Sequence, residues 1–97
     1  MTHTLHLSLK EKWFRMIQSG EKREEYRELT DYWYKRLTNG GVIKRFDIVH
    51  FTLGYPKRDD PDRHLTRAIA DITIGTGKPE WGAEPNKEYF VIRLKED

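Results

Sequence analysis

The segment from Ser19 to Arg27, "SGEKREEYR", places six charged residues in nine positions. Three of them suit a binding site. Lys22 is a compact cation for a phosphate or carbonyl oxygen, and Arg27 can form a fork to a phosphate or a base edge, or stack on a base. Glu25 can accept a hydrogen bond from an amino group or hold the two cations in position. The alternative is a solvated ladder of charges that protects an edge strand from aggregation.

The direction of these side chains decides between the two interpretations. On a regular extended strand, Lys22 faces one side while Glu25 and Arg27 face the other, because successive side chains alternate. A bulge, or the turn that leads into the strand, brings the three together. We predict that they converge and form one wall of a pocket.

Three aromatic residues are further candidates for ligand contact. Tyr26 lies inside the charged motif, Tyr55 in a loop rich in Pro, Gly and Asp, and Trp81 in a second irregular connection. Each can stack on an accessible base, which is worth about 1–3 kcal/mol. Trp81 suits a cap over the open end of a barrel as well as the wall of a cleft, whereas Trp13 is expected in the core. The predicted ligand-binding residues are Lys22, Glu25, Tyr26, Arg27, Tyr55 and Trp81.

Other catalytic and metal motifs are missing from the sequence. There is no cysteine, which excludes disulfides, cysteine-ligated zinc and a thiolate nucleophile. His3 and His6 point to opposite faces of a strand, and His50 and His64 belong to no triad pattern, so structural roles are expected for the latter two. No P-loop, dinucleotide fingerprint or serine elbow occurs. We expect neither a metal nor a cofactor.

Length and composition indicate one globular domain over residues 1–97. The chain has 97 residues, of which 36% are apolar and 12% aromatic, and this is too aromatic for a disordered chain. Its formal charge of +2 is too small for the whole surface to attract nucleic acid without specificity. The start of the chain lacks a signal-peptide pattern, and no long apolar run occurs, so a cytoplasmic protein with no membrane partner is expected.

The first half of the chain predicts two helices between short strands. Residues 4–9 alternate between apolar and polar, as in a half-buried strand. Ser8 and Glu11 form a capping-box pattern, and Gly20 suits a helix end, so a helix is expected from about residue 9 to 19. Residues 22–27 read as a polar strand. A second short helix is expected after Thr30 or Asp31, ending at Gly40 and Gly41.

The second half predicts three strands, over residues 46–53, 65–75 and 88–94, joined by irregular connections. About five strands with two early helices favour an α+β fold, in which a small mixed sheet curls into a barrel that one helix plugs.

The spacing Gly20, Lys22, Glu25 and Arg27, or G-x-K-x-x-E-x-R, together with the preceding "LSLKEKWFRMIQSG", resembles the ASCH family of small domains, which are related in fold to PUA domains. The later "FDIVHF" and the closing "EYFVIRL" occur in that family's order, and "TLGY" and "EWGAEP" are similar to a phage and bacterial subgroup. The resemblance implies a PUA-like β-barrel with a cleft near the charged motif. It also implies that the ligand is RNA or a nucleoside.

Two functions follow from this resemblance. The first is a module that binds RNA or a nucleoside without catalysis. The second is an amidohydrolase, because some small ASCH proteins remove the acetyl group of N4-acetylcytidine with a lysine, a threonine and a glutamate. Lys22 matches that lysine, but Glu25 stands where those enzymes carry the threonine, and a carboxylate is the poorer nucleophile. In an enzyme, Lys22 and Glu25 would have to act as a different acid–base pair. A protein-interaction role through exposed aromatics is a third, weaker alternative.

Overall fold

A five-stranded sheet with strand order β1-β5-β6-β7-β2 forms the frame of the protein. The computed structural model describes residues 2–96. The strands of this sheet are β1 (Thr4–Leu9), β2 (Glu24–Glu28), β5 (Ile48–Leu53), β6 (His64–Thr76) and β7 (Glu88–Leu94). The other elements are the helices α1 (Glu11–Gln18) and α2 (Asp31–Leu37), the short strands β3 (Thr38–Asn39) and β4 (Val42–Ile43), and two 3-10 turns, η1 (Pro61–Arg63) and η2 (Pro79–Trp81).

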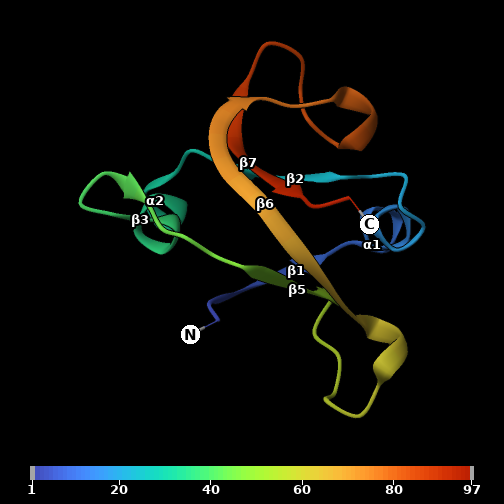
Figure 1. Ribbon diagram of the computed structural model, residues 1–97. Coiled ribbons are helices and arrows are strands. Elements are labelled where there is room, and N and C mark those ends of the chain that lie inside the picture. Colours follow the sequence, from blue (N-terminus) through green and yellow to red (C-terminus); the bar gives the residue numbers. More distant parts are fainter. Residues whose placement is uncertain (1, 97) are drawn as a thin grey trace.

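The long strand β6 makes the sheet curl. Its first half pairs with β5 and its second half with β7, and the register shifts between Ile69 and Asp71, as at a β-bulge. A bulge bends a strand and increases its twist, and β6 arches across the molecule in Figure 1. Of the strand pairs, β1 with β5 is parallel and the others are antiparallel. The resulting half-barrel leaves β1 and β2 as its two edges.

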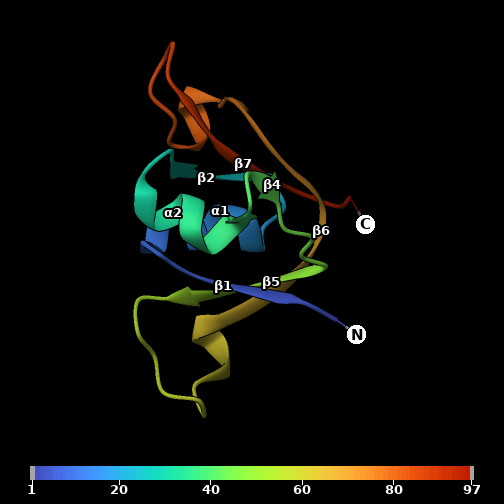
Figure 2. The ribbon, with the colours of Figure 1, turned by 90° about the vertical axis from the view of Figure 1, so that its left-hand side faces the viewer.

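Both helices lie on the concave side of this half-barrel, between the β2–β7 pair and the β1–β5 pair (Figure 2). The predicted α+β fold, a small curled sheet of five strands with two short helices, is confirmed and is consistent with a PUA-like barrel.

Strand alternation supplies the main core. The predicted inward face of residues 4–9 is buried, as is one face of β7. The buried residues of this core are Leu5, Leu7, Leu9, Phe14, Ile17, Leu37, Val49, Phe51, Ile69, Phe90, Ile92 and Leu94. A second, smaller core lies on the other face of β2 and β7, under the connection from β6 to β7, and consists of Tyr26, Ala83, Tyr89 and Val91 with Trp81 against it. Both faces of β7 are therefore covered.

The first helix differs from its prediction at the N-terminus. It begins at Glu11, its N-cap residue is Lys10, and no side chain caps it, so the predicted capping box of Ser8 and Glu11 is wrong. The reason is that Ser8 is still part of β1, where it pairs with Thr52 of β5. The predicted helix end is correct, since Gly20 has a φ of +87° and its amide donates to the carbonyl of Ile17.

The second helix follows its prediction more closely. Thr30 caps α2 by accepting from the amide of Trp33 at 3.4 Å. Beyond its end, Gly40 and Gly41 form the turn of a small hairpin, β3–β4, which was not predicted; both have positive φ, as a tight hairpin turn requires. No helix within residues 2–96 is long and apolar enough to span a membrane.

Candidate functional site

The turn between α1 and β2 sets the position of Lys22. β2 begins at Glu24, two residues later than predicted, so Lys22 precedes the strand. Its amide donates to the carbonyl of Met16 at 3.0 Å, and the carbonyl of the next residue, Arg23, accepts from the amide of Leu94 at 3.0 Å. Backbone hydrogen bonds on both sides therefore fix this turn. Because Lys22 lies in the turn, its side chain does not have to follow the alternating directions of the strand.

Lys22 and Glu25 form a buried ion pair. The Lys22 side chain is 1% exposed and that of Glu25 is 7% exposed, with Nζ and Oε1 3.1 Å apart. The ammonium also donates to the backbone carbonyl of Trp81. The rings of Trp13 and Tyr26 each lie with their centroids 5.0 Å from Nζ, so that the cation is surrounded by aromatic faces and a single carboxylate.

Glu25 is shared between two cations. Its second oxygen, Oε2, pairs with Nη1 of Arg27. Arg27 also donates to the carbonyl of Tyr26 at 2.9 Å and to the carbonyl of Ser8 at 3.0 Å, and its guanidinium lies 5.3 Å from the Trp33 ring. The three charged side chains of the motif thus converge, and the turn before the strand brings them together.

Burial and charge act in opposite directions on Lys22. Burial lowers the pKa of its ammonium below the usual value, while attraction and the hydrogen bond to Glu25 raise it again. The neighbouring Tyr26 has a raised pKa because its phenol is buried. That hydroxyl donates to Glu24 at 2.8 Å and accepts from the amide of Lys78 at 2.9 Å. Within the described chain every buried side-chain nitrogen or oxygen has a hydrogen-bond partner, which indicates a rigid site.

A cavity of about 290 Å³ opens beside this charged cluster. Such a volume is at the lower end of ordinary ligand pockets, which measure about 300–1,000 Å³. Four of its lining residues are aromatic, and three carboxylates and the guanidinium of Arg27 supply charged hydrogen-bonding groups. The lining residues are Trp13, Glu25, Tyr26, Arg27, Glu28, Trp81, Gly82, Glu84 and Tyr89. The arrangement can hold a small flat ligand by stacking while one acceptor and one donor contact its polar edge.

Lys22 itself is not part of this lining, although it belongs to the cluster beneath it. At the rim, Lys87 joins Glu28 and Glu84, with its Nζ 3.0 Å and 3.4 Å from their carboxylate oxygens. Within residues 2–96 no group of three or more histidines or acidic residues is arranged to hold a metal ion.

The structure brings together five of the six residues predicted from the sequence. Tyr26 and Trp81 lie beside the Lys22–Glu25–Arg27 cluster, and Trp81 lines the cavity rather than only capping the barrel. Tyr55 does not join them: it is 97% exposed, in the loop between β5 and η1, and is not among the lining residues.

Trp13 and Tyr89 are lining residues that sequence reasoning missed. Trp13 was expected in the core, but it is only partly buried, and its ring packs against the backbone of Gly82. A signal was present, because Phe14 and Ile17 already fill the buried face of α1 and leave Trp13 at its border. Tyr89 lies on the face of β7 opposite Phe90 and Ile92, and nothing in the sequence showed that the β6–β7 connection would cover that face.

Comparison of the chain with protein-family models, with curated proteins and with solved structures found no match. The site consists of a buried carboxylate held by two cations, next to a small cavity with four aromatic lining residues.

Proposed function

We propose that this protein is an ASCH-like domain that binds a nucleobase, as part of a nucleoside or of an accessible RNA nucleotide, in the cavity beside Glu25 and Arg27. The observation that carries the proposal is the position of Glu25. It is buried between Lys22 and Arg27, and yet it borders a cavity with aromatic walls. The resemblance of the G-x-K-x-x-E-x-R motif to ASCH domains supports the choice of ligand class.

The chemistry of the walls fits a base. An aromatic side chain stacks on any base, while a carboxylate accepts from an exocyclic amino group such as N4 of cytosine. Arg27 has five N–H donors, of which the three contacts to Glu25, Tyr26 and Ser8 use three. The remaining donors suit a carbonyl oxygen on the same base. A base that carries an amino group and a carbonyl group on one edge, such as cytosine, uses both groups at once.

An amidohydrolase acting on a modified nucleoside such as N4-acetylcytidine is the second candidate. It is favoured by one observation, the buried Lys22–Glu25 pair, in which burial lowers the pKa of the lysine. We rank it second because the Lys22 amine donates to Glu25 and to the carbonyl of Trp81 and is not part of the cavity lining. A substrate in the cavity meets Glu25 before it meets Lys22.

Calorimetric titration with cytidine and with N4-acetylcytidine tests the proposal. We expect binding of at least one of the two, and a loss of about 5- to 150-fold in affinity in Trp81→Leu, because one stacking partner is worth about 1–3 kcal/mol. Tyr55→Ala is the matched control, since that ring is exposed and outside the cavity. Equal loss in both variants, or no binding of either nucleoside or of short cytidine-containing RNA, would contradict the proposal. Acetate released from N4-acetylcytidine, detected by one-dimensional NMR and absent in Glu25→Gln, would favour the hydrolase instead.

A further inference from the structure

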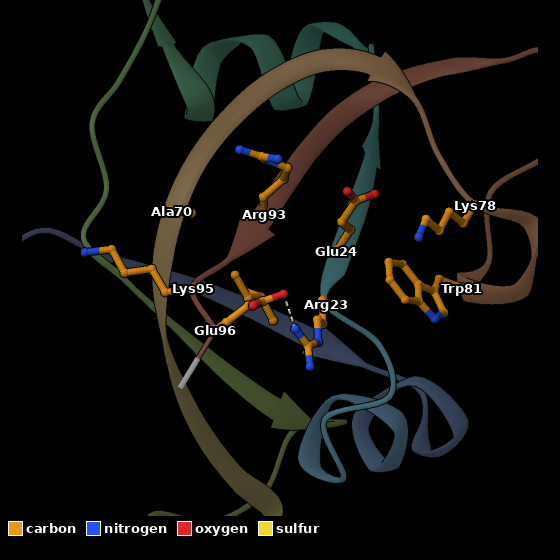
Figure 3. Close-up of a pocket in the computed structure, with 9 residues that line it drawn as sticks. Arg23, Glu24, Ala70, Lys78, Trp81, Arg93, Lys95 and Glu96 are labelled. Carbon is orange, nitrogen blue, oxygen red and sulfur yellow. Dashed lines mark hydrogen bonds and ion pairs between the residues drawn. The ribbon is translucent and has the colours of Figure 1, made fainter.

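A second cavity, of about 510 Å³, shares Trp81 with the first. It lies on the side of β2 and β7 where the last residues of the described chain pass (Figure 3). Four of its lining residues are cationic, namely Arg23, Lys78, Arg93 and Lys95. In Figure 3 Lys78 and Trp81 reach it from the connection between β6 and β7, whereas the Lys95 side chain, on the opposite side, points away from the other labelled residues.

The two cavities differ in charge. The first is lined by three carboxylates, those of Glu25, Glu28 and Glu84, against one cation, Arg27. The second has four cations against two carboxylates, Glu24 and Glu96. Lys22 and Lys87 pair with the carboxylates of the first cavity from outside its lining, so that cavity carries little net charge, whereas the second keeps an excess of cations that attracts an anionic group.

Two of the four cations of the second cavity, the arginines, are already paired with carboxylates. Arg23 is paired with Glu96, and Arg93 makes two hydrogen bonds to Asp71, at 2.8 Å and 2.6 Å. Neither Lys78 nor Lys95 makes an ion pair with any residue in the range 2–96. The Nζ of Lys78 lies 4.4 Å from the centroid of the Trp81 ring, so this ammonium stands directly beside the residue that lines both cavities.

We propose that the second cavity is a phosphate subsite, and that the ligand of this protein is a phosphorylated nucleoside, either a mononucleotide or a nucleotide within RNA, whose phosphate lies beside Lys78. This rests on the proposed function, because the base occupies the first cavity. In a nucleotide only the sugar separates the base from the phosphate, and here Trp81 lines both the first cavity and the cationic one. The Lys22 ammonium donates to the Trp81 carbonyl and fixes that shared residue.

Titration calorimetry with three probes tests this assignment: cytidine, cytidine monophosphate (the 5′ and the 3′ isomer) and inorganic phosphate. We expect at least one monophosphate to bind about tenfold or more tightly than cytidine, because the phosphate gains charge-assisted contacts. In Lys78→Gln this gain is lost, and the affinity for the monophosphate falls by a larger factor than the affinity for cytidine. Lys35→Gln, an exposed lysine on α2, is the matched control and keeps the gain. The gain also decreases as salt is raised from 50 to 500 mM, because screening weakens a charge contact.

The other outcomes separate the two proposals. If cytidine and its monophosphates bind equally, the phosphate subsite is wrong while the base site stands. If inorganic phosphate binds as tightly as a monophosphate, the cationic cavity is an anion site without connection to the base, and the subsite is again wrong. If no probe binds, the proposed function fails and the subsite fails with it.

Discussion

Arg27 on β2 donates a hydrogen bond to the carbonyl of Ser8 on β1, with 3.0 Å between nitrogen and oxygen. These two strands are the opposite edges of the five-stranded sheet. The same guanidinium holds Glu25, which in turn holds the buried Lys22. One side chain therefore ties the edges of the half-barrel together and fixes the carboxylate of the candidate site.

Arg27→Lys tests this double role. A lysine keeps the charge but lacks the planar fork that reaches Glu25, Tyr26 and Ser8 at once. We expect the free energy of unfolding to decrease by about 1–3 kcal/mol, the range for lost hydrogen bonds to a charged group. Urea unfolding followed by tryptophan fluorescence measures this. Arg58→Lys, in the exposed loop before η1, is the control and is expected to stay within about 0.5 kcal/mol of the wild type.

The two partners of the buried ion pair are expected to respond differently to removal. Glu25→Gln leaves the buried ammonium of Lys22 without a counter-charge, so we expect a loss of about 3–5 kcal/mol of stability. Lys22→Met is expected to cost less, about 1–3 kcal/mol, because Glu25 keeps Arg27 as its counter-charge although Glu25 Oε1 and the Trp81 carbonyl each lose a donor. Urea midpoints of both variants decide the order. A larger loss of stability in Lys22→Met than in Glu25→Gln would mean that Arg27 does not balance the charge of the Glu25 carboxylate.

Gly77 is expected to tolerate no side chain. A Cβ there would lie 2.6 Å from the Tyr26 ring and 2.7 Å from the Cβ of Ala83, inside the small second core. Gly77→Ala should therefore destabilise the fold by about 1–3 kcal/mol and displace Tyr26. Gly75, two residues earlier, has open space at the same position, and Gly75→Ala is the matched control. Equal thermal midpoints of the two variants would show that the β6–β7 connection does not pack against Tyr26 and Ala83 at Gly77.

A histidine pair on the outer face should make stability depend on pH. His64 Nε2 donates to the carbonyl of Lys57 at 2.9 Å, so its Nδ1 accepts from Nε2 of His50, also at 2.9 Å. Burial, with smaller effects of His6 and His64, holds the pKa of His50 below its ordinary value of 6.5. The unfolded chain then binds more protons as the pH falls through about 6.5, and stability decreases.

Thermal midpoints at pH 7.5 and pH 5.5 measure this dependence. We expect the wild type to be less stable at pH 5.5 and the difference between the two pH values to be smaller in His50→Gln. An unchanged difference in His50→Gln would assign the pH dependence to other groups.

The sequence predicted the frame of this molecule better than its site. Alternation in residues 4–9 is a local property that the strand keeps in the fold, and the Thr30 cap and the Gly20 helix end are equally local. The capping box failed because pairing with β5 holds Ser8 in β1, and such pairing cannot be read from nearby residues.

The site depends on contacts between distant segments. Lys22 precedes the strand because its amide bonds to Met16 and because the following residue of the turn bonds to Leu94. The second of these bonds depends on the last strand, which lies far away in the sequence. Trp81 contacts Lys22 across 59 positions, and the His50–His64 bond joins two strands whose register the sequence does not reveal. Residue types indicated which side chains could bind a ligand, while tertiary packing decided which of these side chains contact one another. Tyr55 is an aromatic residue suited to stacking, but it is exposed and lies outside the candidate site.

The most direct test of the central claim is an NMR titration of isotopically labelled protein with cytidine monophosphate, in which every amide reports its own environment. The base site predicts shifts concentrated at residues 25–28 and 81–84, at the motif strand and the Trp81 turn, with little change at residues 54–60 around Tyr55. Shifts that are absent, or that concentrate at 54–60 and leave the Glu25–Arg27 strand unchanged, would contradict the assignment of this cavity as the ligand site.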